Sequence, residues 1–305
     1  MDSNSPRVGF IGAGRAANAL ASALHEKGYR VASVASRTLA SAEALVGRIE
    51  GCVPHANLQE VADDCDLVFI TTPDDTIETI AREVKWHGEM GVAHCSGVES
   101  ASILGAAQQQ GANVGSFHPM QTFTATTQGA NTFSGVAFAV EGPSPLIDTL
   151  NEMSRVLGGW PVKVRPEHRA LYHLSGFLAC GLMTAQIGQA ADLWKVMGYT
   201  REQGLEVILP ILRGTVDSLE AHGIPGALTG PISRGDLGTV RKHLESLESY
   251  APSLVPLYCH IALGAVKMAR EKGGINQIKE QELNALLEER LAGAETLFAG
   301  TPFTG

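Results

Sequence analysis

The chain has 305 residues, of which 44% are hydrophobic and 18% are charged, which is enough for two globular domains. Its net charge of −9, without a basic run, argues against nucleic acid or an anionic membrane as a partner. No stretch approaches the ~18 uninterrupted apolar residues of a membrane-spanning helix, and the opening MDSNSP lacks the pattern of a secretory signal. We therefore expect a cytoplasmic protein. Its five cysteines have no CxxC spacing, which predicts reduced thiols, and no HExxH-like spacing suggests a metal.

Alternating strand and helix patterns fill the first half of the chain. Residues 7–11 predict a buried strand, and residues 15–27 predict an amphipathic helix that ends at Gly28. Further strands are expected at 29–36, near Cys52, and at 66–72, 91–97, 112–119, 135–142 and 160–164, with helices beginning near Ser41, Asn57, Asp74 and Pro145. This alternation predicts a Rossmann-type, mostly parallel sheet with helices on both faces.

No strand pattern follows Arg165. Residues 167–198 predict one long helix that is apolar around most of its circumference, as expected of a helix packed against other helices or a second subunit. Residues 226–244 are rich in Gly, Pro, Thr and Arg and predict a polar loop between two helices. We therefore predict a dinucleotide-binding domain at residues 1–165 and an all-helical substrate and dimerisation domain at residues 166–305.

The segment GAGRAA at residues 12–17 directly follows the first predicted strand and opens the first predicted helix. In a dinucleotide-binding turn the first glycine permits the tight turn and the second lets a pyrophosphate approach the backbone. The amides at the start of the helix then hold the phosphates. The residues expected to contact the cofactor here are Gly12, Gly14, Arg15 and Ala16.

The end of the second strand distinguishes NADP from NAD. An NAD site usually has an acid there, about twenty residues past the glycines. This chain instead has Ser36, Arg37 and Thr38, which suit a 2′-phosphate and favour NADP over NAD. The alternative is a solvent-exposed Arg37 in a merely polar loop. Three residues after the strand at 66–72 are expected to pass under the cofactor ribose: Thr71, Thr72 and Pro73.

Two other strand ends supply candidate catalytic side chains at the carboxyl edge of the sheet, where ligands of such folds bind. Ser96 follows one strand and could hydrogen-bond a substrate carbonyl or carboxylate, whereas His94 is expected to be a hydrogen-bonded core residue. His118 precedes Pro119 at the next strand end and could bind the substrate or donate a proton. A structural role for His118 is the alternative. Asp74 is interpreted as part of a helix start.

The helical half supplies two candidates for holding the acid end of a substrate. His173 follows Tyr172 in the long helix and is also a candidate catalytic residue. Arg234 lies in the polar segment and could pair with a substrate carboxylate or with Asp236 two residues away. The residue pattern leaves both options for Arg234 open.

Five segments resemble one family over nearly the full chain: GFIGAGRAA, HCSG, FHPMQTF, YHLSGFLACGL and ALTGPISRGDLGTVRKHL. They resemble Rossmann-like oxidoreductases with a helical C-terminal domain of unknown function. The architecture is more distantly similar to 6-phosphogluconate-dehydrogenase-like proteins, namely pyrroline-carboxylate, β-hydroxyacid, ketopantoate and prephenate enzymes. The resemblance implies NAD(P)-dependent redox chemistry and a homodimer through the helical domains. Prephenate dehydrogenases also have a His-Pro-Met string, which supports a substrate-side role for His118.

We therefore expect an NADP-dependent oxidoreductase that transfers a hydride between the nicotinamide and a small carbonyl or imine compound bearing a carboxylate. A non-catalytic NADP-binding sensor or scaffold is the alternative. It stays open because the chain has Cys180-Gly181 where relatives are expected to carry an asparagine, and because the helix lacks the lysine of β-hydroxyacid dehydrogenases. A deazaflavin-dependent NADP oxidoreductase ranks third, since the second domain of those enzymes is much smaller.

Overall fold

The computed structural model describes residues 5–124 and 131–298, so the expectation for the first six residues falls largely outside it. The chain forms two compact units, Met1–Leu182 and Met183–Gly305. The division lies within a continuous helical run, further along the chain than the boundary expected after residue 165. The amino-terminal unit therefore includes the first turns of the long helix as well as the sheet.

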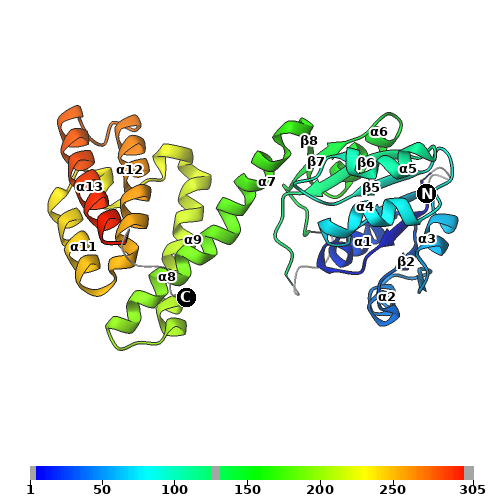
Figure 1. Ribbon diagram of the computed structural model, residues 1–305, viewed down its shortest axis with the longest axis horizontal. Coiled ribbons are helices and arrows are strands. Elements are labelled where there is room, and N and C mark those ends of the chain that lie inside the picture. The colour runs from blue at the N-terminus through cyan, green and yellow to red at the C-terminus, as the bar shows by residue number, and fades with distance from the viewer. Residues whose placement is uncertain (1–4, 125–130, 299–305) are drawn as a thin grey trace. The chain divides into compact units, whose positions relative to one another are not determined.

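The first unit, which carries the sheet in Figure 1, is built on eight strands. Their order is β3-β2-β1-β4-β5-β6-β7-β8. The strands are β1 (Val8–Ile11), β2 (Val31–Ala35), β3 (Val53–His55), β4 (Leu67–Ile70), β5 (Gly91–His94), β6 (Asn113–Pro119), β7 (Ala137–Glu141) and β8 (Trp160–Val162). All neighbours pair in parallel except β6 and β7, which are antiparallel. The predicted mostly parallel sheet is confirmed. Parallel neighbours need a crossover, usually a helix, and the described residues between β6 and β7 contain none.

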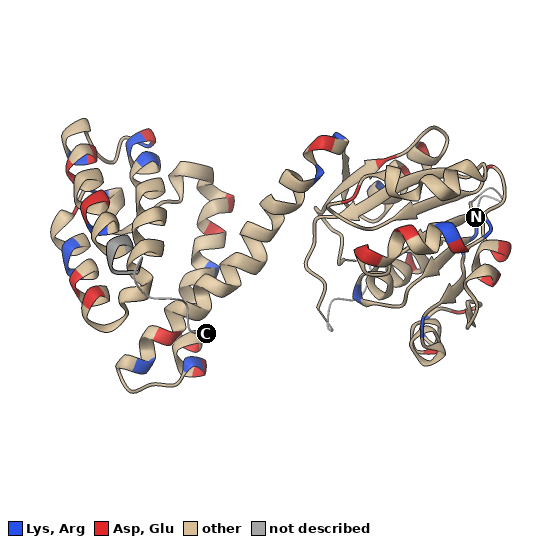
Figure 2. Ribbon diagram, viewed as in Figure 1, with Lys and Arg blue, Asp and Glu red and all other residues tan. Residues whose placement is uncertain are grey.

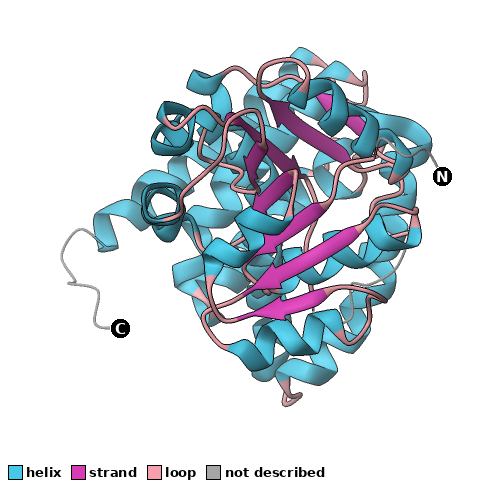
Figure 3. Cartoon of the chain, turned by 90° about the vertical axis from the view of Figure 1, so that its right-hand side faces the viewer, coloured by secondary structure: helices cyan, strands magenta, loops and turns pink. Residues whose placement is uncertain are grey.

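Helices cover both faces of this sheet (Figure 3). They are α1 (Arg15–Glu26), α2 (Leu39–Val46), α3 (Leu58–Asp64), α4 (Asp74–Glu83), α5 (Gly105–Gln109), which follows the 3₁₀ turn Ala101–Leu104, and α6 (Leu146–Val156). On the face covered by α1 and α6, four phenylalanines form a continuous row: Phe10, Phe69, Phe117 and Phe138. The opposite face packs Ile11, Ile70 and Val92 against α3, α4 and α5. Each face thus has its own core, as a doubly covered sheet requires.

The predicted long helix is present as a continuous run that changes its pitch. It comprises the 3₁₀ turn Pro166–His168, α7 (Arg169–Phe177), the π-helical turn Leu178–Leu182 and α8 (Met183–Val196). Gly176 lies where the helix meets Met120, because an added Cβ would come within 2.5 Å of the Met120 Sδ. Residues 170–191 include no Lys, Arg, Asp or Glu, and their ribbon is therefore tan in Figure 2. By length and composition alone, the run Pro166–Val196 could cross a membrane.

The second unit is helical throughout its described residues. It contains α8, α9 (Arg201–Gly226), α10 (Gly230–Ser233), α11 (Leu237–Tyr250), the 3₁₀ turn Pro252–Leu254, α12 (Val255–Glu271) and α13 (Gln277–Phe298). Its core joins α11, α12 and α13. The expected loop at 226–244 is wrong in part, because α10 and the start of α11 lie within it. Asp236 caps α11 by accepting from the Thr239 amide at 3.0 Å, and the helix continues from there.

Candidate functional site

The glycine turn after β1 has the conformation that a dinucleotide-binding turn requires. Gly12 has a φ of +112°, and a Cβ there would lie 2.8 Å from the Thr71 carbonyl carbon. No side chain caps the following helix at Gly14, so the first amides of α1 remain available to an anion. Gly14 and Arg15 are exposed, whereas Ala16 is partly buried. The turn therefore presents backbone N–H donors, and at the two glycines no side chain lies between these donors and a ligand.

The end of β4 lies directly against this turn. The Thr71 hydroxyl donates to the Gly12 carbonyl at 3.0 Å, so Thr71 holds the glycine turn in place. The Thr72 hydroxyl is buried and has no hydrogen-bond partner among the described residues. An orphaned buried hydroxyl needs an explanation, and a ligand at this edge would provide one. Pro73 is exposed beside it.

The residues after β2 form an exposed polar segment. Ser36 is partly buried, whereas Arg37 and Thr38 are exposed. The Thr38 hydroxyl hydrogen-bonds with the Ser41 hydroxyl at 2.7 Å. β1 and β2 are neighbours, so this segment and the glycine turn lie at the carboxyl ends of adjacent strands. Together with the Gly12 cradle and the orphaned Thr72 hydroxyl, these residues fit a dinucleotide.

Ser96 is fully occupied within the loop that follows β5. Its hydroxyl donates to Asp74 Oδ2 at 2.9 Å and accepts from the amides of Val98 and Glu99 at 3.3 and 3.1 Å. One donor and two acceptor positions exhaust what a hydroxyl offers. The predicted catalytic role of Ser96 stays a prediction, and these bonds favour a structural role in shaping the loop.

His94 is buried and hydrogen-bonded, as predicted. Its Nδ1 accepts from the Ser96 amide at 3.1 Å, and its Nε2 contacts the Ser100 carbonyl at 3.0 Å. Because Nδ1 accepts a hydrogen bond and Nε2 faces a carbonyl oxygen, which can only accept, the ring proton lies on Nε2. Burial lowers the pKa of His94 to about 4, which leaves the ring neutral at pH 7. His94 therefore supports the loop from inside the sheet.

His118 and His173 approach each other at the carboxyl end of the sheet. Their ring centroids lie 6.2 Å apart. They also flank Gly97, where a Cβ would come within 2.7 Å of His173 Cδ2 and 2.8 Å of His118 Nε2. Only a glycine at position 97 leaves room for both rings. Gly97 thus leaves space in which the two histidines proposed from the sequence approach each other. The sequence alone assigned no role to Gly97.

Tyr172 fixes the orientation of the His118 ring. Its hydroxyl hydrogen-bonds with His118 Nδ1 at 2.9 Å and can donate to the His118 carbonyl oxygen at 3.3 Å. This contact directs the opposite nitrogen, Nε2, toward Gly97. Burial, with a smaller electrostatic contribution from neighbours that include Arg169, lowers the pKa of His118 to about 4. His118 therefore faces the site as a neutral imidazole.

A cavity of about 230 Å³ opens beside these rings. It is formed by the end of β6, α7 and the π-helical turn, and its lining residues are His118, Met120, Gln121, Thr122, His173, Gly176, Phe177, Ala179 and Cys180. A cavity of this size admits a small molecule, and its walls are largely apolar apart from the two imidazoles and the residues Gln121 and Thr122. The arrangement can position a small apolar compound with one polar group directed at His118.

Other predicted site features are placed as follows. Arg234 pairs with Asp236 at 3.7 Å in the second unit, which is one of the two options left open by the sequence. Its substrate role stays a prediction. Within the described residues, no group of three or more His, Cys, Asp or Glu side chains could hold a metal ion. Sequence reasoning assigned no role to Gly97, Arg169 or Tyr172, because each acts on a residue distant in the chain.

Two family models match separate parts of the chain. Residues 7–93 match the family described as NADP oxidoreductase, coenzyme F420-dependent. Residues 136–265 match the family described as a domain of unknown function, DUF2520. No protein of curated function matches the chain significantly.

Solved structures share the whole architecture. A candidate NADP oxidoreductase from Bacteroides fragilis is 25% identical, with a TM-score of 0.70, over 86% of this chain and 98% of that one. 1-Pyrroline-5-carboxylate reductase from Streptococcus pyogenes is 14% identical, with a TM-score of 0.61, over 96% of this chain and 100% of that one. A reductive aminase from Aspergillus terreus, in complex with NADPH and ethyl-5-oxohexanoate, is 14% identical, with a TM-score of 0.57, over 95% of each chain. The last two similarities establish the fold.

The resemblance noted in the sequence is therefore confirmed. The chain joins an amino-terminal segment that matches the NADP oxidoreductase model to a carboxyl-terminal segment that matches the DUF2520 model, on a fold similar to that of pyrroline-carboxylate reductase.

Proposed function

We propose that this protein is an NADP-dependent oxidoreductase that acts on a small carbonyl or imine compound. The observation that supports this most is the shared sheet edge: the glycine turn follows β1, and His118 lies at the matching end of β6. β4 and β5, which lie between them, contribute the orphaned Thr72 hydroxyl and Gly97. A cofactor held at the turn and a substrate in the cavity beside His118 would meet along that edge.

The cofactor would be held by residues that the sequence also indicated. The amides at Gly14 and Arg15 would bind the pyrophosphate, and Gly12 would let it approach the backbone. Ser36, Arg37 and Thr38 would bind the 2′-phosphate. When bound, NADPH supplies a hydride to the carbon of a C=O or C=N group.

We expect Arg37→Ala to weaken NADPH binding by about 10- to 100-fold while leaving NADH binding unchanged. The reason is that a charge-assisted hydrogen bond to phosphate is worth about 1.5–3 kcal/mol. Fluorescence titration of the purified protein with each nucleotide measures both affinities. Arg30→Ala is the matched control, because Arg30 is exposed at the opposite end of β2. Equal affinity of the unmodified protein for NADH and NADPH would contradict the assignment of NADP.

His118 would hydrogen-bond the reacting group of the substrate. When the Tyr172 hydroxyl donates to Nδ1 rather than to the His118 carbonyl oxygen, Nε2 carries the proton and can donate to a carbonyl oxygen or imine nitrogen. In the other tautomer, Nε2 accepts from a substrate hydroxyl or amine, which suits the reverse reaction. His173 would lie beside the same group, and Arg234 is the proposed partner of a substrate carboxylate. Imines are included because the similar solved structures include a reductive aminase.

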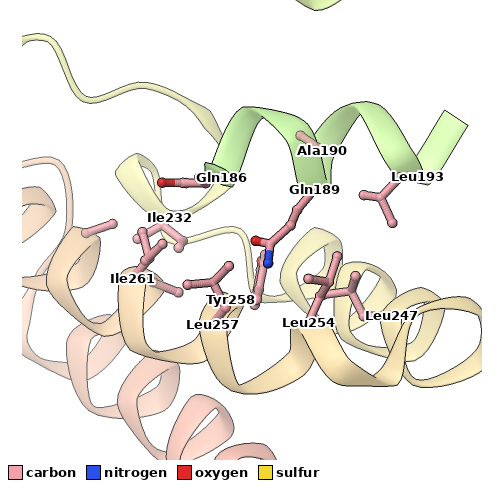
Figure 4. A pocket seen from close by; sticks show the side chains of 12 residues that line it. Gln186, Gln189, Ala190, Leu193, Ile232, Leu247, Leu254, Leu257, Tyr258 and Ile261 are labelled. Carbon is pink, nitrogen blue, oxygen red and sulfur yellow. The ribbon is translucent and has the colours of Figure 1, made fainter. Parts of the chain in front are cut away.

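We also propose that the protein is a homodimer held together by its uncharged helical surfaces. Leu171, Leu178 and Leu182 are between 43% and 65% exposed along the helical run. In the second unit, an apolar cavity of about 270 Å³ separates α8 from α12 (Figure 4). A second one, of about 670 Å³, opens beside the carboxyl end of α8. Uncharged helix surfaces beside apolar cavities of the same chain fit a second copy as the covering partner.

Leu178→Glu is expected to weaken this dimer by at least about 100-fold. Each buried leucine contributes about 1.5–3 kcal/mol, and a two-fold interface repeats the change. Sedimentation velocity over a concentration series measures the effect. The control is Leu39→Glu, which changes a leucine that is 42% exposed on α2. A wild-type monomer, or partition of the wild type into phospholipid vesicles, would contradict the dimer.

A further inference from the structure

Arg169, the first residue of α7, has an unusual environment. It is 1% exposed and is the only Arg, Lys, Asp or Glu among the buried residues of the described chain. Removing a guanidinium from water is costly unless its charge and all its donors are compensated. The position of Arg169 therefore calls for a physical reason.

Only part of the hydrogen-bonding capacity of this guanidinium is satisfied. Nη2 lies 3.2 Å from Glu141 Oε2 at the end of β7. Nε and Nη1 are buried and have no hydrogen-bond partner in the described part of the chain. An ion pair that served stability alone would satisfy the remaining donors, and replacing such a pair by apolar side chains is often stabilising. The arrangement instead leaves two N–H groups of the charged guanidinium buried beside an ion pair, without acceptors among the described residues.

That charge lies over the sheet face that carries the site histidine. Strand pairing aligns His94, Ser116 and Glu141 across β5, β6 and β7. His118 lies two residues beyond Ser116 on the same strand and therefore on the same face. Arg169 is held by Glu141 on β7, which pairs with the strand β6 that carries His118.

The same helix also contacts His118 directly. Tyr172 is three residues beyond Arg169, one turn along α7, and its hydroxyl hydrogen-bonds with His118 Nδ1 at 2.9 Å. α7 therefore acts on the ring twice, through a hydrogen bond at Nδ1 and through a nearby buried charge. The titratable and charged groups that surround His118 are His94 on β5, Glu141 on β7, and Arg169, Tyr172 and His173 on α7.

We propose that Arg169 is a positioning residue: from its buried ion pair with Glu141 it reinforces the neutral state of the His118 imidazole, which burial establishes and which Tyr172 holds at Nδ1. Arg169 itself touches no reacting atom. A neutral ring keeps a lone pair and a proton on opposite nitrogens, so that Nε2 can donate or accept at the substrate according to the tautomer. This inference rests on the proposed function only for the substrate-side role of His118. The direction of the His118 pKa, lowered partly by Arg169, agrees with it.

The test is an NMR titration of the histidine rings in the purified full-length protein, with the His118 signal assigned by its absence in His118→Gln. In Arg169→Gln we expect the His118 pKa to rise by at least about one unit, a tenfold gain in proton affinity. Arg169→Lys, which keeps the charge, is expected to retain most of the lowered value. His87, which contacts the Ala62 carbonyl, serves as the internal control and should not shift. A folded Arg169→Gln protein with an unchanged His118 pKa would overturn the proposal.

A second variant keeps the test decisive if Arg169→Gln does not fold. Glu141→Gln removes the compensating carboxylate, so the guanidinium charge acts on His118 more strongly and its pKa should fall further. A pKa that stays the same or rises in this variant would contradict the proposal. Neither titration requires cofactor or substrate. Absence of any turnover would therefore count against the proposed function and leave this result intact.

Discussion

Replacing His118 with glutamine is expected to lower kcat/KM by about 10²- to 10⁴-fold, the range found for positioned proton-transfer groups. Glutamine approximates the size of the ring but cannot exchange a proton between two nitrogens. The pKa of about 4 also sets the pH profile. Turnover that depends on the neutral ring should stay level between about pH 8 and pH 6 and decline as the pH approaches 4. The assay follows NADPH absorbance with a panel of small ketones and imines.

The control for this substitution is His168→Gln. His168 is exposed three residues before Leu171 and hydrogen-bonds only with Arg165 among the described contacts. Its replacement should leave turnover unchanged, and both variants should bind NADPH as the unmodified protein does. Indifference of turnover to His118→Gln would remove His118 from the chemistry. Tight NADPH binding without turnover of any carbonyl or imine would instead favour the non-catalytic sensor.

Gly12→Ala is expected to weaken NADPH binding by at least about 100-fold and to lower the melting temperature. A positive φ costs an alanine about 1–2 kcal/mol. The added Cβ would also lie 2.8 Å from the Thr71 carbonyl carbon and 2.9 Å from the Thr72 nitrogen. Relief of that overlap would move the turn that receives the pyrophosphate. Fluorescence titration and thermal unfolding measure the two effects separately.

Two further glycines separate binding from folding. Gly14 has a φ of −74°, and its nearest neighbour to an added Cβ is the Thr71 oxygen at 4.0 Å. Gly14→Ala should therefore fold normally and still bind NADPH less tightly, because the methyl group occupies the approach to the backbone. Gly105→Ala, where nothing lies within 4 Å, should change neither quantity. Unaltered NADPH affinity in Gly12→Ala would mean that the turn serves packing alone.

Much of the fold was predictable because local patterns coincide with the buried positions. Val8–Ile11 and Leu67–Ile70 are buried along their whole length, as continuous apolar runs predict. Residues 226–244 show the limit of this approach. Glycine, proline and threonine there predict a loop, yet the Asp236 side chain caps a helix that packs Val240 and Leu244 into the core. Tertiary packing overrides composition at such a segment.

The sequence predicts which residues of the candidate site lie at strand ends. It does not predict the contacts between α7 and β6. His118 and the glycine turn follow apolar strands, so their position at the sheet edge follows from the pattern alone. Tyr172 is 54 residues from its partner His118, and no local pattern indicates that contact. Ser96 follows β5, as the strand pattern indicates. Its three hydrogen bonds depend on Asp74 and on loop geometry that the sequence does not specify.

The π-helical turn Leu178–Leu182 contributes to one of the two walls of the cavity. One wall, at the end of β6, carries His118, which Tyr172 orients and Gly97 accommodates. The other wall consists of Phe177, Ala179 and Cys180. Exchanging residues on this second wall would change the shape and polarity of the cavity and would leave the hydrogen bond between Tyr172 and His118 in place. A cavity built in this way can vary its lining independently of the imidazole that it presents.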